Sequence, residues 1–325
     1  MSSTTINYAE LAGINSVGAA AVFLAVYLPL TGWFVFQSVK RLAAVYILMV
    51  LFCLMRTGAF LIRALMAKPG STASTNMTAS IVDQILFNAG FFALLYGAFG
   101  TVLDRCVAKS LPLILPAILT ITYSSSHIMA GGKRYPRTTL NPLANRIVFH
   151  ILLSGAIIVG VVGSVRNIRS ANDPDSDQAA LAKKLRKIST LILFLLAALQ
   201  LTQSILFFRQ PRRGDGTTLA PAATSSTLAD PRGPGRVLLI IISKLLIVRQ
   251  LFLLATIDHT SKANQESLWY PLVAVPELLV ALMFALPGLV PVRKELKAVE
   301  RERREANAES EENYKMGMGV RPRYV

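Results

Sequence analysis

The chain has 325 residues, of which 53 % are hydrophobic and only 16 % are charged. Its formal net charge of +16 would suit a nucleic-acid-binding protein if the cations formed a surface patch. They lie instead in short connectors beside apolar stretches, where the positive-inside bias of membrane proteins explains them, so we expect no nucleic-acid partner. With only two cysteines, the sequence holds no disulfide framework.

Seven stretches of the chain are long enough to cross a membrane, which takes about 20 apolar residues for a hydrocarbon core about 30 Å thick. They are apolar on every side, unlike the amphipathic helices of a soluble protein. The sequence therefore predicts an all-α fold, a polytopic transmembrane helix bundle within residues 1–292, whose first span is retained. In chain order the stretches are residues 12–36, 42–66, 81–103, 147–165, 188–208, 237–257 and 270–292.

An eighth stretch, residues 111–129, is interrupted by Pro112, Pro116 and a Ser-Ser-Ser-His run. With seven crossings and the N-terminus outside, 16 of the connector Lys and Arg residues near the spans fall inside and 8 outside. With eight crossings the split is 11 against 13, which is no bias. The positive-inside rule therefore favours seven spans, N-out and C-in, with residues 111–129 as a re-entrant or interfacial segment. Eight spans remain the alternative.

The connectors contain two further predicted regions. Residues 209–236 are rich in Gly, Pro, Ser, Thr and Ala, which predicts a flexible cytoplasmic loop. Residues 293–325 begin with many mixed charges, which predicts a charged cytoplasmic tail, and the sequence does not identify a protein partner for it. Asn76 opens an N-glycosylation sequon in a predicted outside loop. Cys106 is a juxtamembrane thiol, either palmitoylated or free.

Several polar residues fall inside the predicted spans, where a charge at the helix centre costs about 2.5–3.5 kcal/mol and has to face the bundle interior. Counted at 1.5 Å per residue, four of them from four spans lie about 10–15 Å from the outer surface. We therefore predict a polar pocket in the outer half of the bundle, formed by Arg56, Asn88, Arg249 and Glu277. Secondary polar residues are Asp83, Gln84, Gln200, Lys244 and Gln250.

Glu277 is the most deeply placed carboxylate among the spans, so it is the expected counter-ion for the buried arginines. We expect it to pair with Arg249, with Arg56 as the competing partner. Such a pair has two interpretations, a structural clamp that fixes helix register and a pocket that binds a ligand. Pro276 precedes the carboxylate and is expected to distort its helix locally.

The sequence contains no convincing catalytic or metal-binding arrangement. Its three histidines are His127 and His150, expected near the cytoplasmic face, and His259, expected near the outer face. A three-histidine metal site would need them together on one side of the membrane. No Gly-x-Ser-x-Gly turn or phosphate-binding glycine loop occurs. We therefore expect no enzyme activity, no metal and no cofactor.

Two resemblances to known families follow from short motifs. Over most of residues 8–292 the chain resembles an uncharacterised fungal seven-transmembrane family, a domain of unknown function, which implies the fold and no activity. The motifs are Asn88-x-Gly90, Gly160-Val161-Val162-Gly163, Leu246-Ile247-Val248-Arg249 and Pro276-Glu277-Leu278-Leu279. More loosely, Gly58-Ala59-Phe60-Leu61-Ile62-Arg63 is similar to the Gly-Tyr-x-x-Arg motif of the fungal RTA-like lipid-translocating exporters, which implies lipid export. Arg56-Thr57 replaces the acid that those exporters carry before the glycine.

These features lead to a functional hypothesis with two alternatives. Seven spans with basic cytoplasmic connectors predict a receptor-like sensor in the plasma membrane or an endomembrane, with the lipid bilayer and a small amphiphilic ligand as partners. The polar residues inside the spans also fit a transporter or translocase for a lipid or amphiphile, although no internal repeat typical of transporters is evident. A non-catalytic structural membrane component is the second alternative.

Overall fold

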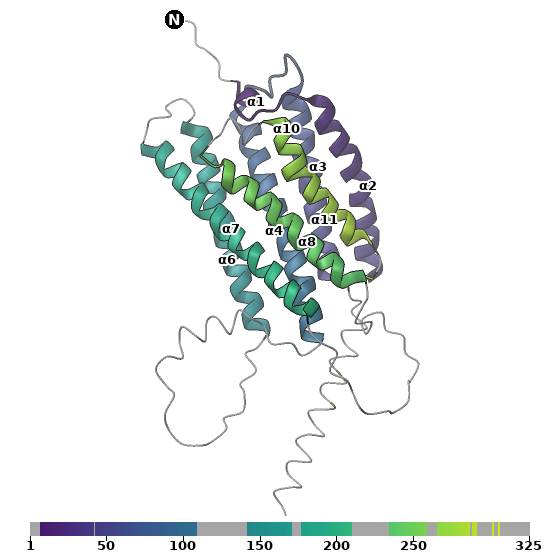
Figure 1. Cartoon of the computed structure of the whole chain (residues 1–325). Helices are drawn as coiled ribbons and strands as arrows, with labels where there is room; N and C mark the ends of the chain where they lie inside the picture. The colour runs from purple at the N-terminus through teal and green to yellow at the C-terminus, as the bar shows by residue number, and fades with distance from the viewer. Residues whose placement is uncertain are drawn as a thin grey trace, which may run out of the picture.

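The computed structural model describes residues 7–41, 43–108, 142–170, 177–209, 234–258, 265–286 and 288–290, together with residues 301 and 305. Within these ranges the chain is helical and contains no strand (Figure 1). Seven helices are long and apolar enough to cross a membrane, so the predicted all-α bundle of a multi-pass membrane protein is confirmed. The predicted segment 111–129 lies outside the described residues.

The helices run back and forth along the bundle. The end that carries the N-terminal segment and residues 68–76 is called the N-terminal end below. In chain order the elements are α1 (Tyr8–Leu11), α2 (Val17–Arg41), α3 (Ala44–Ala67), α4 (Met77–Ala108), α6 (Pro142–Arg169), α7 (Asp177–Arg209), α8 (Pro234–Thr256), α10 (Glu266–Trp269), the π-helical turn η2 (Tyr270–Ala274) and α11 (Val275–Ala285).

Helix α4 is the centre of the bundle and the most buried of the seven spans. It packs against α3 on one side and α6 on the other, and it also contacts α7, α8 and α11. Helices α2 and α3 form one flank, and α6 and α7 form the other (Figure 1). The last span, α11, packs against α8 and therefore closes the bundle beside the central helix.

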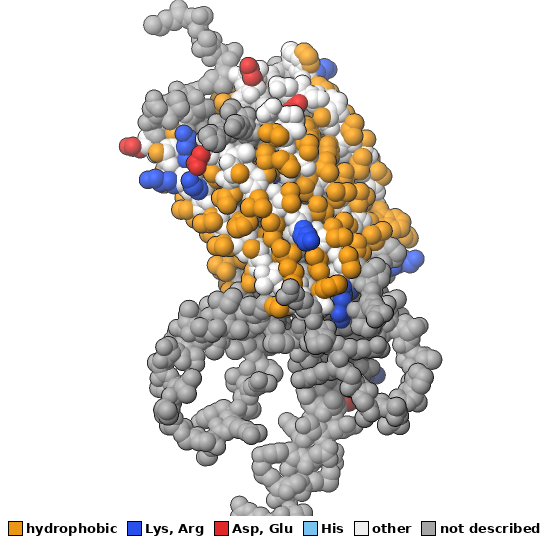
Figure 2. Space-filling view, viewed as in Figure 1, with side chains coloured by type: hydrophobic (Ala, Val, Ile, Leu, Met, Phe, Trp, Pro, Cys, Tyr) orange, Lys and Arg blue, Asp and Glu red, His pale blue; other side chains and the backbone are white. Residues whose placement is uncertain are grey.

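The surface of the bundle between its two ends is mostly apolar (Figure 2). Acidic side chains and several basic ones gather toward the N-terminal end, and further basic ones lie at the opposite end. Large side chains such as Val22, Leu28 and Ile158 are more than 60 % exposed, which a lipid environment tolerates and water does not.

Two predicted span boundaries were wrong, each for a local reason. The first span begins at Val17 instead of residue 12, because Gly13 takes a left-handed conformation (φ +66°) that ends α1. The last span ends at Ala285 instead of residue 292. Leu286 is extended, as expected of a residue before proline, and Gly288 again has a positive φ of 86°.

The other boundaries shift mainly by extension of helices beyond the apolar stretches. Helix α7 begins at Asp177, eleven residues before the predicted span, because about three further turns that carry several charged residues continue the helix past the apolar region. Helix α8 begins at Pro234, so residues 234–236 of the predicted loop 209–236 are helical. Residues 210–233 lie outside the described part, as does the tail 293–325 apart from residues 301 and 305.

Small residues allow the closest helix contacts. A Cβ atom on Gly160 of α6 would lie 2.5 Å from the Ser189 hydroxyl of α7, whose Oγ donates to the Ala156 carbonyl at 2.6 Å. A Cβ on Gly97 of α4 would lie 2.7 Å from the methyl carbon of Met49 on α3. Both contacts depend on the missing side chain of glycine.

Polar contacts fix the two ends of the bundle. At the N-terminal end, Glu266 Oε1 accepts from the backbone N–H groups of Asn15 and Ser16 at 2.8 and 3.0 Å, which ties α10 to the start of α2. At the opposite end, Arg105 Nη2 donates to the carbonyls of Gly288 and Leu289 at 2.6 and 2.8 Å. Arg105 therefore holds the chain after α11 against the end of α4.

Candidate functional site: a shared carboxylate between two buried arginines

Arg56 lies in the middle of α3 and is fully buried. Its Nε donates to Glu277 Oε2 at 2.7 Å and its Nη2 to Oε1 at 2.8 Å, the two-point geometry in which a guanidinium best matches a carboxylate. Its remaining N–H groups are directed at the backbone of α4: Nη1 lies 3.4 Å from the Leu86 carbonyl and 3.2 Å from the Phe87 carbonyl, and Nη2 lies 3.1 Å from the latter. Arg56 thus joins α3 to α4 and α11, using all five of its donors.

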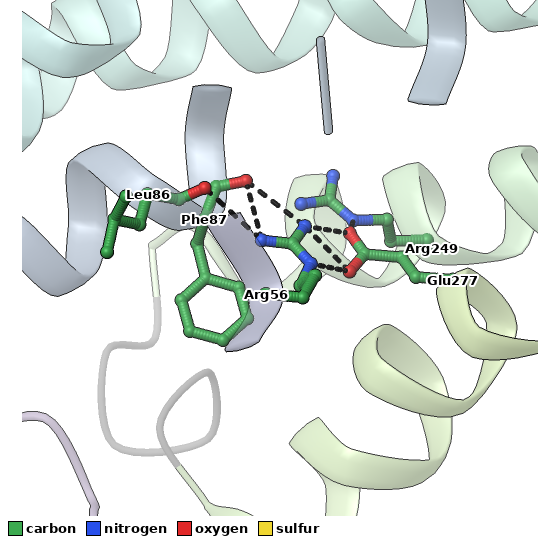
Figure 3. Close-up of polar contacts among 5 residues, drawn as sticks. All are labelled: Arg56, Leu86, Phe87, Arg249 and Glu277. Carbon is green, nitrogen blue, oxygen red and sulfur yellow. Dashed lines mark hydrogen bonds and ion pairs between the residues drawn. The ribbon is translucent and has the colours of Figure 1, made fainter. Parts of the chain in front are cut away.

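Arg249 approaches the same carboxylate from α8. Its Nε donates to Glu277 Oε1 at 2.5 Å, and the side chain is only 5 % exposed. Within the described part of the chain its Nη1 and Nη2 make no hydrogen bond, and Figure 3 shows them on the side of the guanidinium away from Glu277. Four of its five N–H donors therefore have no acceptor among the described residues.

Glu277 is thus bound by both arginines at once. The predicted ion pair with Arg249 is present, but the expectation that Arg56 competes with it was wrong, because the two carboxylate oxygens provide enough lone pairs for both. Counted at 1.5 Å per residue from the helix ends that lie at the N-terminal end of the bundle (Ala67, Thr256 and Glu266), the three residues lie about 10–17 Å deep. The sequence predicted that the three residues lie at similar depth, and similar depth is a condition for their contact.

The backbone before Glu277 departs from a regular α-helix. Residues Tyr270–Ala274 form a π-helical turn, in which the Val275 N–H donates to the Tyr270 carbonyl. Pro276 is the second residue after this turn and has no N–H to donate to it. Such wide turns inside a helix are frequent at functional sites. The helix is therefore distorted near Pro276, as expected, in a turn that ends three residues before the shared carboxylate.

Aromatic rings surround the guanidinium groups. The Cζ atom of Arg249 lies 3.8 Å from the centre of the Phe91 ring, and that of Arg56 lies 4.4 Å from the Phe87 ring and 5.1 Å from the Phe52 ring. The negative face of a ring attracts a cation, so these contacts replace part of the hydration that burial removes. They also fix the plane in which Arg249 holds its unbonded nitrogens.

A second buried ion pair, Arg63 with Asp83, joins α3 to α4 nearer the N-terminal end. Arg63 Nε lies 3.2 and 3.3 Å from the two carboxylate oxygens, and the Arg63 guanidinium stacks 3.8 Å from the Trp269 ring. The sequence placed both residues in spans but did not pair them.

The signal for that pairing was the spacing of seven residues on each antiparallel helix. Arg56 and Arg63 are seven apart on α3, and Asp83 and Gly90 are seven apart on α4. Seven residues are about two helical turns, so each set shares a face. In the structure Arg63 meets Asp83, and a Cβ on Gly90 would lie 3.0 Å from Arg56 Nη1. The absence of a side chain at Gly90 gives Arg56 its room.

The other predicted pocket residues do not join the ion cluster. Asn88 and Gln84 of α4 are partly buried and make no hydrogen bond within the described residues. Lys244 of α8 is exposed on the outside of the bundle, so its prediction as an interior polar residue was wrong. The apolar pattern alone could not show on which side of α8 it falls.

The glutamines form a separate polar seam between α7 and α8. Gln200 Nε2 lies 3.5 Å from the Ser243 hydroxyl, which also lies 3.0 Å from the Ser204 hydroxyl. Gln203 and Gln250 are buried, and neither amide atom of either side chain has a hydrogen-bond partner in the described part. Of these three glutamines, only Gln200 makes a side-chain hydrogen bond to another helix within the described residues.

The two predicted modification sites have different outcomes. Asn76 is exposed just before α4, and its Oδ1 accepts from the Thr78 N–H at 2.8 Å, which leaves its amide nitrogen free for a glycan. Cys106 lies in the last turn of α4, and its side chain is outside the described part. His127 and His259 also lie outside it. Among the described residues, no group of three or more His, Cys, Asp or Glu side chains could hold a metal ion.

The cluster can bind and hold charge, and it can couple helices, since one carboxylate connects α11 with α3 and α8. Arg56 is saturated with acceptors, whereas Arg249 is not. Comparison with known proteins adds no assignment: no family model, no curated protein and no solved structure matches the chain.

Proposed function

We propose that this multi-pass membrane protein is a non-catalytic, receptor-like sensor whose ligand binds beside Arg249 and Glu277. The observation that carries the proposal is one buried carboxylate shared by arginines from two other helices. A ligand that engages Arg249 competes with Glu277 for it. Ligand binding therefore changes a contact between helices, which is what a sensor requires.

The two ion pairs differ, so that separating Arg249 from Glu277 costs less free energy than separating Arg56 from it. Without Arg249, the Arg56–Glu277 pair is still neutral and held by two hydrogen bonds. Only the single bond between Arg249 Nε and Glu277 Oε1 has to break. The contact between α8 and α11 is then free to shift, while α3, α4 and α11 remain joined through Arg56.

Translocation of a lipid or amphiphile is the second candidate. The observation in its favour is the break in the last span, where the π-helical turn η2 interrupts the α-helix three residues before Glu277. Discontinuous helices beside polar residues are typical of transporter substrate sites. The resemblance to RTA-like exporters points in the same direction.

A cell lacking the chain and complemented with variants distinguishes these candidates. The complementing chains are the natural sequence, Arg249→Gln and, as a matched control, Lys244→Gln, which removes an exposed cation from the same helix. Two readouts are compared at equal protein level: the transcriptional response to added amphiphiles and the transbilayer movement of a fluorescent phospholipid. We expect Arg249→Gln to lose the transcriptional response, and Lys244→Gln to retain it.

The movement of the fluorescent phospholipid is the readout that can overturn the sensor proposal. If loss of the chain changes phospholipid movement and Arg249→Gln reproduces that change, the chain is a translocase. If neither readout responds to loss of the chain, a structural role replaces both candidates.

A further inference from the structure

We infer that Arg249 binds the anionic group of the ligand, a carboxylate or a phosphate. This inference rests on the proposed function and names the chemical class that the site accepts. It is carried by three observations: the unbonded donors of Arg249, the net charge of the buried cluster and the setting of the guanidinium.

The donors of the two arginines are used very differently. Arg56 directs every N–H group at an oxygen of Glu277 or of the α4 backbone. Within the described residues Arg249 bonds through Nε alone, although the residue is only 4 % exposed. The two Nη atoms are not among the fully buried atoms without a partner, so an acceptor from outside the chain can reach them and would satisfy donors that the chain leaves unbonded. Two adjacent N–H edges match the two oxygens of a carboxylate or phosphate.

The charge of the cluster has the sign that such a ligand would neutralise. Arg56 and Arg249 contribute two positive charges and Glu277 one negative charge, which leaves a net charge of +1. Arg63 and Asp83 neutralise each other, so Asp83 is not available to Arg249. An uncompensated charge at this depth is expensive in a membrane, and a bound monoanion would remove it.

The guanidinium is also held in one plane before any ligand arrives. Phe91 covers one face, with 3.8 Å between the ring centre and Cζ, and Glu277 fixes the Nε edge. Figure 3 shows the remaining edge directed away from Glu277. Asn88 lies one turn from Phe91 on α4, and Gln250 follows Arg249 on α8. Both have amide groups without a partner in the described residues.

The test uses the purified full chain in nanodiscs of phosphatidylcholine, a zwitterionic lipid without net charge. Thermal unfolding is followed with decanoate, decyl phosphate, decanol and decyltrimethylammonium, and with acetate and inorganic phosphate as soluble anions. We expect both anionic amphiphiles to raise Tm in a saturable way, and decanol and the cationic amphiphile not to do so. Arg249→Gln should weaken the binding of decanoate roughly tenfold or more, which corresponds to loss of a charge-assisted hydrogen-bonded pair.

Two further variants separate recognition from folding and from general charge effects. Lys244→Gln removes an exposed cation from α8 and should bind decanoate like the natural chain. Arg249→Lys retains the charge without the planar fork, and is expected to bind more weakly than the natural chain but more tightly than Arg249→Gln. Because Arg249→Gln leaves the neutral Arg56–Glu277 pair intact, its Tm without ligand should not fall.

The outcomes also show whether the anion is soluble or lipid-like, and whether the anion inference or the proposed sensor function has failed. Saturable binding of acetate or phosphate alone identifies a soluble anion, and binding of the decyl compounds alone identifies a lipid-like ligand. Equal stabilisation by decanol and decanoate, lost in Arg249→Gln, overturns the anion inference but keeps the proposed sensor. Stabilisation that is equal in the natural chain and Arg249→Gln overturns the inference, and an unaltered transcriptional response of Arg249→Gln in cells overturns the sensor.

Discussion

Arg56 and Glu277 form a two-point ion pair between α3 and α11, with 2.7 Å from Nε to Oε2 and 2.8 Å from Nη2 to Oε1. The Arg56 and Glu277 side chains are 0 % exposed. Arg249 adds a second cation to the same carboxylate through one hydrogen bond of 2.5 Å. Since the three residues are not equivalent in this arrangement, their substitutions are expected to differ.

Removal of the shared carboxylate should be the most damaging change in the cluster. Glu277→Gln leaves two buried guanidinium groups without a counter-charge, for which we expect a loss of about 3–5 kcal/mol in the free energy of unfolding. Arg249→Gln leaves a neutral pair and is expected to be nearly neutral for stability. Thermal unfolding of the detergent-solubilised variants measures both. Equal losses from the two substitutions would contradict the asymmetry between the arginines.

The double variant of Arg249→Leu and Glu277→Leu gives a sharper test of the shared carboxylate. It leaves Arg56 buried without a counter-ion, so stability should not return to that of the natural chain. The triple variant that also carries Arg56→Leu should recover a large part of it. Full recovery in the double variant would mean that Arg56 does not depend on Glu277.

The Arg63–Asp83 pair should behave as an isolated pair of charges. Arg63→Leu or Asp83→Leu alone leaves one buried charge, whereas the double variant leaves none. We expect the double variant to be more stable than the sum of the single losses predicts, by a coupling energy of about 0.5–3 kcal/mol. The measurement is a double-mutant cycle on thermal unfolding, and strictly additive losses would show that the two side chains do not interact.

Gly90 should tolerate even a methyl group poorly. A Cβ at this position would lie 3.0 Å from Arg56 Nη1 and 3.3 Å from its Cζ, and Arg56 is held by all its hydrogen bonds. Gly90→Ala is therefore expected to destabilise the bundle by about 1–3 kcal/mol. Gly32→Ala on α2 is the control, since no atom lies within 4 Å of its added Cβ. If Gly32→Ala lost as much stability as Gly90→Ala, the loss would come from the helix backbone and not from the contact with Arg56.

The expected membrane topology leads to a prediction that can be tested in cells, without purified protein. With seven spans, N-out and C-in, a C-terminal reporter should be cytoplasmic and Asn76 should accept an N-linked glycan. Asn76 is exposed and its amide nitrogen is free, so the structure does not obstruct the modification. The measurement is the mobility shift after glycosidase treatment, with Asn76→Gln as control. A lumenal C-terminal reporter would restore residues 111–129 as an eighth span.

The number and approximate position of the spans follow from the sequence, because crossing a hydrocarbon core requires a minimum length of apolar helix whatever its neighbours. The depth of Arg56, Arg249 and Glu277 follows in the same way from the fixed rise per residue. Helix ends are less determined, since Gly13 and Asp177 end or extend helices through local backbone conformation outside the apolar stretches.

Which polar residues meet was decided by the tertiary structure. Depth is a property of one helix, whereas contact also requires that both helices be neighbours and turn the right faces toward each other. The packing of α3 between α2 and α4 brings Arg56 to Glu277 and Arg63 to Asp83, and the rotation of α8 turns Arg249 inward and Lys244 outward. Apolar spans carry little periodicity that reveals this rotation, because lipid and protein interior are both apolar and favour the same side chains.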